Sequence, residues 1–197
     1  MRLDPNTLGD LAVLFAPTAY VRVTRMVHAA TPLGSGYGAT RFASPHDAFK
    51  VIYAAESLAT ALAETVVRDR FQARARRVLR EEELAFWGAT MIDAQRPLTL
   101  IDLRTTGLLR LGISTDAARA KVHAQGRKLS QALHDQTDVD GLVYASRLTG
   151  ADCICVYERA TAKLLAAPLA ELPRLSGLTA ALQALNVTIV PSRLSSR

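Results

Sequence analysis

Three side chains able to do chemistry follow one another in the first third of the chain. Arg41 comes after a glycine-rich segment, Tyr53 lies in a short apolar stretch, and Glu64 lies in the next amphipathic segment. A guanidinium can hold a phosphate through paired, charge-assisted hydrogen bonds, and an aromatic ring can stack on a planar ligand. A carboxylate can stabilise positive charge that develops during a reaction. Together these residues predict a pocket for an anionic, ring-containing ligand.

Each of these residues also has a simpler interpretation when it is considered alone. Counting about 100° per residue places Glu64 away from the apolar stripe around Leu62, which favours a solvated helix glutamate. Arg41 is compatible with a surface charge, and Tyr53 with a half-buried strand tyrosine. The sequence around them leaves both interpretations open.

A second motif combines a hydroxyl and a guanidinium at the end of a predicted strand. A turn at Asp140-Gly141 leads into a strand that ends in Ser146-Arg147, and such a pair suits an anionic ligand. The same pair could instead cap the strand end. Upstream, Arg22 interrupts an apolar strand, but strand alternation places it on the face of Tyr20, so it need not be buried.

The elements that must position these side chains predict one α+β domain over residues 1–197. We expect central mixed β-sheets with flanking helices, a core over about 20–160, and a helix–strand extension over 176–190. Residues 31–39 contain several glycines and predict a loop. The predicted strands are 20–24, 50–54, 84–92, 98–103, 141–144 and 152–157; the predicted helices are an N-terminal one capped by Asn6 or Thr7, one from Ser57 to about Arg70, and 116–134.

Composition narrows the class of protein. Apolar residues make up 49% and charged residues 21%, which is typical of a globular chain. Cys153 and Cys155 lie on one face of a predicted strand and are expected to be buried free thiols, which suits a reducing cytoplasm. No apolar run approaches the roughly 20 residues of a membrane span. The histidines show no metal-ligand spacing, and no phosphate-binding loop of the nucleotide triphosphatase kind is present.

The net charge of +6 owes much to one basic cluster. Because three glutamates follow the cluster directly, a mixed solvated surface is the favoured interpretation, with an acidic partner protein and nucleic acid as alternatives. A basic binding module without enzymatic activity would fit the charge, but aromatic residues are only 6% and do not alternate with the basic ones. The cluster comprises Arg68, Arg70, Arg74, Arg76, Arg77 and Arg80.

The joint order of these motifs resembles the RES-domain family, named for an arginine, a glutamate and a serine. The likeness runs from about Tyr20 to Arg159, and seven short motifs in one order are fairly specific. Either Arg22 or Arg25 matches the first arginine of the family, and Val21 stands where the family often has an aromatic residue. The matching segments are 20–25, 40–42, 51–54, 61–65, 100–103, 140–147 and 153–159.

The resemblance implies a fold similar to that of ADP-ribosyltransferases and a role as the toxin of a toxin–antitoxin pair. Such toxins degrade NAD⁺ by hydrolysis or phosphorolysis, without a metal, and some transfer ADP-ribose to a protein instead. The expected partner is a DNA-binding, Xre-like antitoxin that blocks the active site, and a homodimer is also possible. By resemblance, the catalytic residues are Glu64, Arg41 and Tyr53, and the NAD⁺-binding residues are Arg22, Arg41, Tyr53, Ser146 and Arg147.

Overall fold

The computed structural model describes residues 1–68, 70–71, 74, 76–114 and 123–191. Its strands are β1 (Ala12–Phe15), β2 (Tyr20–Arg25), β3 (Val51–Ala55), β4 (Arg77–Arg80), β5 (Trp87–Ala94), β6 (Leu98–Asp102), β7 (Gly141–Ala145), β8 (Asp152–Tyr157), β9 (Leu164–Ala166), β10 (Ala170–Glu171) and β11 (Val187–Val190). Its α-helices are α1 (Pro5–Leu11), α2 (Leu58–Leu62), α3 (Glu81–Leu84), α4 (Gly107–Arg110), α6 (Ala124–Gln136) and α7 (Leu178–Ala184). A π-helical turn, η2 (Ala63–Val67), continues α2, and three 3₁₀ turns are η1 (Met26–His28), η3 (Glu158–Lys163) and η4 (Leu172–Arg174).

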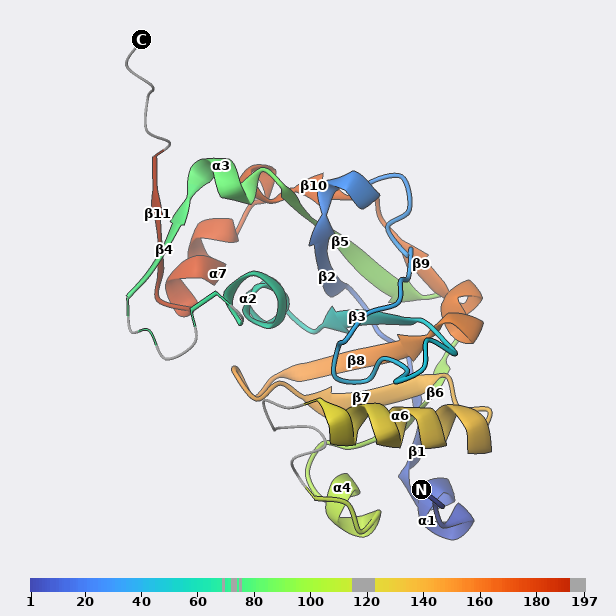
Figure 1. Ribbon diagram of the computed structural model, residues 1–197. Helices are drawn as coiled ribbons and strands as arrows, with labels where there is room; N and C mark the ends of the chain where they lie inside the picture. Colours follow the sequence, from blue (N-terminus) through green and yellow to red (C-terminus); the bar gives the residue numbers. More distant parts are fainter. Residues whose placement is uncertain (69, 72–73, 75, 115–122, 192–197) are drawn as a thin grey trace.

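One large mixed sheet organises the part of the chain that the structure describes. Its strand order is β1-β6-β7-β8-β3-β2-β5-β10, with β9 also paired to β5. Only β6 and β7 run parallel in this sheet as described; its other pairs are antiparallel. A second, parallel pair joins β4 to β11, next to α7 (Figure 1). The α+β class predicted from the sequence is confirmed.

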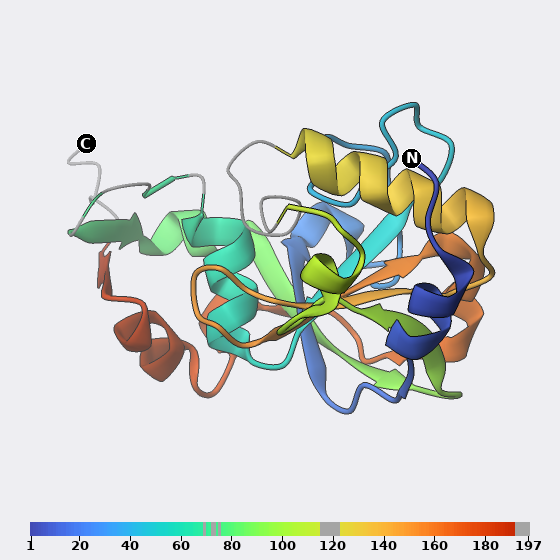
Figure 2. The same ribbon diagram turned by 90° about the horizontal axis from the view of Figure 1, so that it is seen from below.

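Strand alternation buries both faces of the large sheet. On β8, Cys155 and Tyr157 belong to the larger apolar cluster, whereas Ile154 and Val156 belong to a smaller cluster. Both cysteines of this strand are buried and free, as predicted. Apolar residues of α2 and α6 join the larger cluster, so both helices pack against that face of the sheet. Figures 1 and 2 show the two helices well apart, with the segment around residues 31–50 passing close to α6.

Most predicted elements are present, with shifted ends. β2 covers the predicted strand at 20–24, β8 matches 152–157, and the helix–strand pair predicted over 176–190 appears as α7 and β11. The strand predicted at 50–54 starts one residue later, and residues 116–122 of the predicted helix at 116–134 lie outside the described residues.

Three boundary predictions are wrong for local reasons. Asp4, not Asn6 or Thr7, caps α1, because its carboxylate accepts the Thr7 amide (2.8 Å) and Pro5 fixes the first helical position. The strand predicted from Leu84 begins only at Trp87, since Glu81–Leu84 forms a helical turn in which Glu83 accepts the Arg80 amide (2.9 Å). The helix predicted to about Arg70 is α-helical only to Leu62.

The basic cluster contains a strand that the sequence did not predict. β4 pairs with β11 along its length, and Leu79 is buried while Arg80 is exposed. Arg70 pairs with Glu83 (2.7 Å) and Arg80 with Glu82 (3.7 Å), which fits the mixed surface expected for this segment. No helix among the described residues is long and apolar enough to cross a membrane.

Candidate functional site

A pocket of about 380 Å³ opens on the face of the sheet that carries α2. This volume lies within the usual range of small-molecule sites, about 300–1,000 Å³. Four of the six predicted site residues line it: Arg22, Arg41, Tyr53 and Glu64. Other lining residues are Gly36, Tyr37, Gly38, Arg68, Trp87, Tyr144 and Cys153. Residues from β2, β3, η2 and the glycine-rich segment therefore converge on one hollow.

Glu64 reaches this pocket from the π-helical turn η2. Its side chain is 18% exposed, and Arg68 lies 3.7 Å from Oε2. Glu64 does lie away from the apolar stripe of the helix, but the glycine-rich segment and β2 enclose that side as further walls of the pocket. The solvated position that regular periodicity favoured for Glu64 is therefore wrong. Within the pocket its carboxylate is the negative group among three guanidiniums.

Ser146 binds the Glu64 carboxylate from outside the pocket lining. Its Oγ donates to Glu64 Oε1 (2.6 Å) and accepts the amides of Leu148 (3.1 Å) and Thr149 (3.3 Å). Ser146 is buried and does not line the pocket as described, so the structure gives it a place behind the carboxylate rather than against a ligand. The arrangement fixes one carboxylate oxygen and leaves the other toward Arg68.

Arg41 and Tyr53 form one wall of the pocket. Arg41 is buried, and that burial lowers the pKa of its guanidinium, while Tyr144 and Glu64 oppose the shift. The Tyr53 hydroxyl accepts the Phe42 amide (2.9 Å) and lies 3.0 Å from Thr40 Oγ1. Burial raises the pKa of Tyr53 well above its usual value, so the phenol stays neutral. Its hydroxyl is therefore bound to the loop that carries Arg41, and the residue lines the pocket.

Arg22 rather than Arg25 is the pocket arginine of β2. Arg22 Nη2 donates to the Gly34 carbonyl (2.7 Å), but its buried Nε has no hydrogen-bond partner among the described residues. Burial lowers the pKa of Arg22 to about 10. Arg25 instead stacks on Trp87, with its guanidinium carbon 4.0 Å from the ring centroid. A desolvated guanidinium with an unused donor is suited to an anionic ligand.

Arg147 is exposed and lies outside the pocket lining. Its charge adds to the lowering of the Arg41 pKa that burial causes, so it contributes to the positive potential near the pocket. Within the described residues, no group of three or more histidine, cysteine or acidic side chains is placed to hold a metal ion.

Tyr144, Trp87 and Arg68 line the pocket but were not singled out from the sequence. Strand alternation offers a signal for Tyr144, because it lies in β7 two residues before Ser146, which directly follows the strand. Trp87 enters the pocket because β5 pairs with β2, and Arg68 follows Glu64 by four residues, a spacing that places the two side chains together on a helical segment.

Comparison with known proteins gives three findings. A family model described as "RES domain" matches residues 19–183. A protein of Sinorhizobium fredii named "Probable toxin y4kH" is 43% identical over 84 residues, covering 42% of this chain and 65% of that protein. A chain in the crystal structure of the M. tuberculosis MbcT–MbcA toxin–antitoxin complex aligns with a TM-score of 0.66 and 20% identity, over 93% of this chain and 98% of that chain.

These findings carry different weight. The structural neighbour, at 20% identity, shows the shared fold, and the chain spans just under two thirds of the Sinorhizobium protein. The family model covers most of the chain, including all the pocket residues described above. The chain therefore belongs to the RES domain family.

Proposed function

We propose that this chain is the toxin of a toxin–antitoxin pair and that it consumes NAD⁺ by cleaving the nicotinamide–ribose bond. The observation that carries the proposal is the convergence of the Glu64 carboxylate, the buried Arg41, the half-buried Arg22 and an aromatic residue on one pocket. NAD⁺ offers a complementary set of groups: a pyrophosphate, a flat ring and a sugar that becomes positively charged when the bond breaks. The names of the Sinorhizobium relative and of the structural neighbour agree with a toxin role.

The proposed reaction breaks the bond between the ribose carbon and the nicotinamide nitrogen. The electron pair leaves with nicotinamide, which becomes neutral, and the ribose acquires oxocarbenium character, as in glycoside cleavage. Glu64 stabilises that charge from within a partly desolvated pocket, where a fixed carboxylate is most effective. Water or phosphate then bonds to the ribose carbon and loses a proton, giving ADP-ribose or its phosphate ester.

The remaining pocket residues bind and orient the dinucleotide in this proposal. Arg22 and Arg41 pair with the pyrophosphate, whose charge offsets their desolvation. The Tyr53 ring stacks on the nicotinamide. Ser146 positions the Glu64 carboxylate, and Arg147 adds positive potential.

Replacing Arg22 with methionine is expected to weaken NAD⁺ binding without lowering the stability of the fold. Removal of the unpartnered, buried Nε relieves a desolvation cost of about 1–3 kcal/mol, although the bond to Gly34 is lost as well. We expect a melting temperature at or above that of the wild type and a KM for NAD⁺ raised about 10-fold. Arg25→Met, on the same strand but outside the pocket, is the matched control for steady-state kinetics and thermal melting. A wild-type KM in Arg22→Met would exclude Arg22 from binding.

Ser146→Ala is expected to lower kcat about 10-fold with little change in KM, because Glu64 loses the bond that fixes its orientation. Ser146→Thr retains a hydroxyl at the same position and is expected to recover part of the loss. Initial rates of nicotinamide release check both variants, and a full kcat in Ser146→Ala would contradict the positioning role.

The proposed reaction is tested by incubating the purified chain with NAD⁺, with and without phosphate, and identifying the products by mass. Free nicotinamide with ADP-ribose or its phosphate ester supports hydrolysis or phosphorolysis, respectively. Repeating the incubation with labelled NAD⁺ and cell proteins distinguishes the alternative, ADP-ribosyl transfer to a protein, by a labelled product. NAD⁺ that remains intact in every condition would refute the proposal.

The proposed partner is an Xre-like antitoxin that covers the pocket, and the proposed location is the cytoplasm. The net charge of +6 favours an acidic partner surface, because complementary charge accelerates association. Adding the antitoxin to the purified chain is expected to stop NAD⁺ loss.

A further inference from the structure

The segment that carries Arg41 has no helix or strand of its own to hold it. Residues 40–44 lie between the glycine-rich segment and β3, yet Phe42 and Ser44 are almost completely buried. Buried backbone groups outside regular structure need partners from elsewhere in the chain. The position of the Arg41 guanidinium therefore depends on whatever satisfies the backbone groups beside it.

One face of α6 supplies most of those partners. Arg127 Nε donates to the Ala43 carbonyl (3.3 Å) and its Nη2 to the Ser44 carbonyl (2.5 Å). Ser130 Oγ donates to the Phe42 carbonyl (2.6 Å). The side chains at 127, 130 and 131 share a helix face at i, i+3 and i+4, and the last of them, Gln131, accepts from Ser44 Oγ (2.7 Å).

The sheet holds the same segment from the opposite side. The Tyr53 hydroxyl on β3 accepts the Phe42 amide, and the Phe42 ring packs edge-on against Tyr144 of β7, with centroids 5.0 Å apart. Phe42, the residue after Arg41, is therefore held on two sides. Its carbonyl accepts a hydrogen bond from α6, and its amide and ring contact the sheet.

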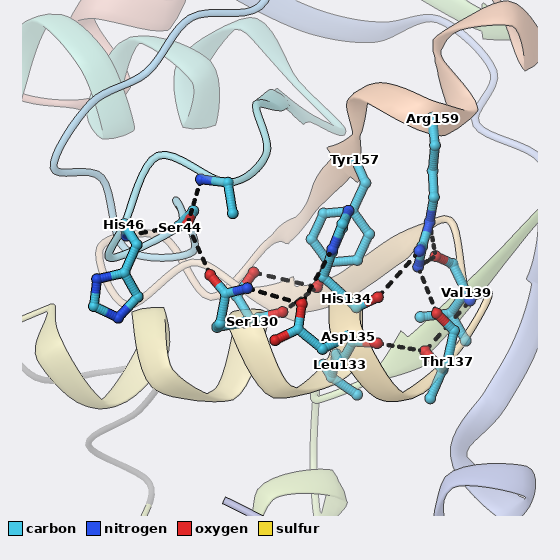
Figure 3. Close-up of polar contacts among 12 residues, drawn as sticks. Ser44, His46, Ser130, Leu133, His134, Asp135, Thr137, Val139, Tyr157 and Arg159 are labelled. Atoms are coloured by element: carbon cyan, nitrogen blue, oxygen red, sulfur yellow. Dashed lines mark hydrogen bonds and ion pairs between the residues drawn. The ribbon is translucent and has the colours of Figure 1, made fainter.

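α6 is itself tied to β8 and to the turn that follows it. The Tyr157 hydroxyl donates to the Ser130 carbonyl (3.1 Å), and Arg159 donates to the carbonyls of His134 (3.2 Å) and Thr137 (2.9 Å) near the helix end. Figure 3 shows these contacts on one side of the helix, with Ser44 reaching the same side. The helix is therefore a fixed support for residues 40–44.

We infer that Arg127, assisted by Ser130, is a positioning residue for Arg41. Its two hydrogen bonds to consecutive carbonyls fix the backbone that follows Arg41, so the guanidinium stays directed into the pocket before a ligand arrives. The consequence for activity rests on the proposed function. A misplacement of about 1 Å in a binding group is enough to cost up to about 100-fold in rate, so loss of this support should be measurable.

Arg127→Met removes both hydrogen bonds but keeps the aliphatic stem. We expect its kcat/KM for NAD⁺ to fall about 10-fold, mainly through a higher KM. Lys128→Met, an exposed position one residue along the same helix, makes the same change in charge and is expected to leave kcat/KM unchanged. Should Arg127→Met melt far below the wild type, Arg127→Lys keeps the charge but not the bidentate grip, and a KM raised at least 3-fold is then expected.

A double-variant comparison separates positioning from a general structural effect. If Arg127 acts through Arg41, adding Arg127→Met to Arg41→Met should change kcat/KM less than 2-fold, because the group being positioned is already absent. Fold-losses that multiply in the double variant, or equal kinetics of Arg127→Met and Lys128→Met, would overturn the inference.

Amide hydrogen exchange tests the support without any enzymatic readout. The amides of Phe42 and Ala43 are expected to exchange at least 10-fold faster in Arg127→Met than in Lys128→Met. If the wild type leaves NAD⁺ intact, the proposed function fails, and this exchange ratio alone decides whether α6 holds the segment. Equal exchange rates in the two variants would overturn the inference whatever the enzyme activity.

Discussion

Replacing Glu64 with glutamine is expected to lower NAD⁺ turnover at least about 10³-fold while the chain remains folded. Glutamine has nearly the same shape, and its side-chain oxygen can still accept from Ser146 Oγ. It carries no negative charge, however, so the positive charge that develops on the ribose loses its stabilising partner. Nicotinamide release over long incubations measures the loss.

The matched control is Glu56→Gln, an exposed carboxylate at the turn after β3. It should retain wild-type turnover, and both variants should melt within about 2 °C of the wild type. Retention of more than a tenth of the activity in Glu64→Gln would show that another group stabilises the transition state.

Gly141→Ala is expected to have the largest effect on stability, lowering the free energy of unfolding by at least about 3 kcal/mol. An added Cβ would lie 2.0 Å from the Cys155 carbonyl oxygen, and the glycine has φ of +155°. Because the clashing atom belongs to the backbone of the central strand β8, it cannot move aside as a side chain can. At about 2–4 °C per kcal/mol for a chain of this size, the melting temperature should fall by about 6–12 °C.

Gly9→Ala in α1 is the control for this substitution, because nothing lies within 4 Å of its added Cβ and alanine favours a helix. We expect Gly9→Ala to melt at or slightly above the wild-type temperature. An unchanged melting temperature for Gly141→Ala would mean that β7 and β8 can separate locally at little cost.

The sequence predicted the strands that carry the site better than the side-chain positions within it. Alternation and β-branched residues located β2, β3 and β8, and these strands carry Arg22, Tyr53 and Cys153 to the pocket. No local sequence pattern predicts the order of these strands in the sheet, because β3 pairs with β8, which lies about half the chain length away in sequence. Trp87 therefore could not be assigned to the site from the sequence.

Glu64 and Arg41 illustrate two physical limits of local patterns. Helical periodicity places Glu64 away from the apolar stripe, but it cannot show that the glycine-rich segment and β2 enclose that side of the helix as a pocket. Arg41 lies in a segment without regular structure, whose shape is set by α6 more than eighty residues away in sequence. Family resemblance identified both residues because it compares whole motifs rather than local geometry.

The hydrogen bonds of Ser146 fix the direction of its hydroxyl hydrogen. With two amides pointing at its oxygen, the hydroxyl has used both lone pairs, and its only hydrogen is directed at Glu64 Oε1. The hydroxyl therefore cannot turn to donate to a ligand, and the two oxygens of one carboxylate stay inequivalent: Oε1 is bound to this hydroxyl, and Oε2 lies 3.7 Å from the Arg68 guanidinium.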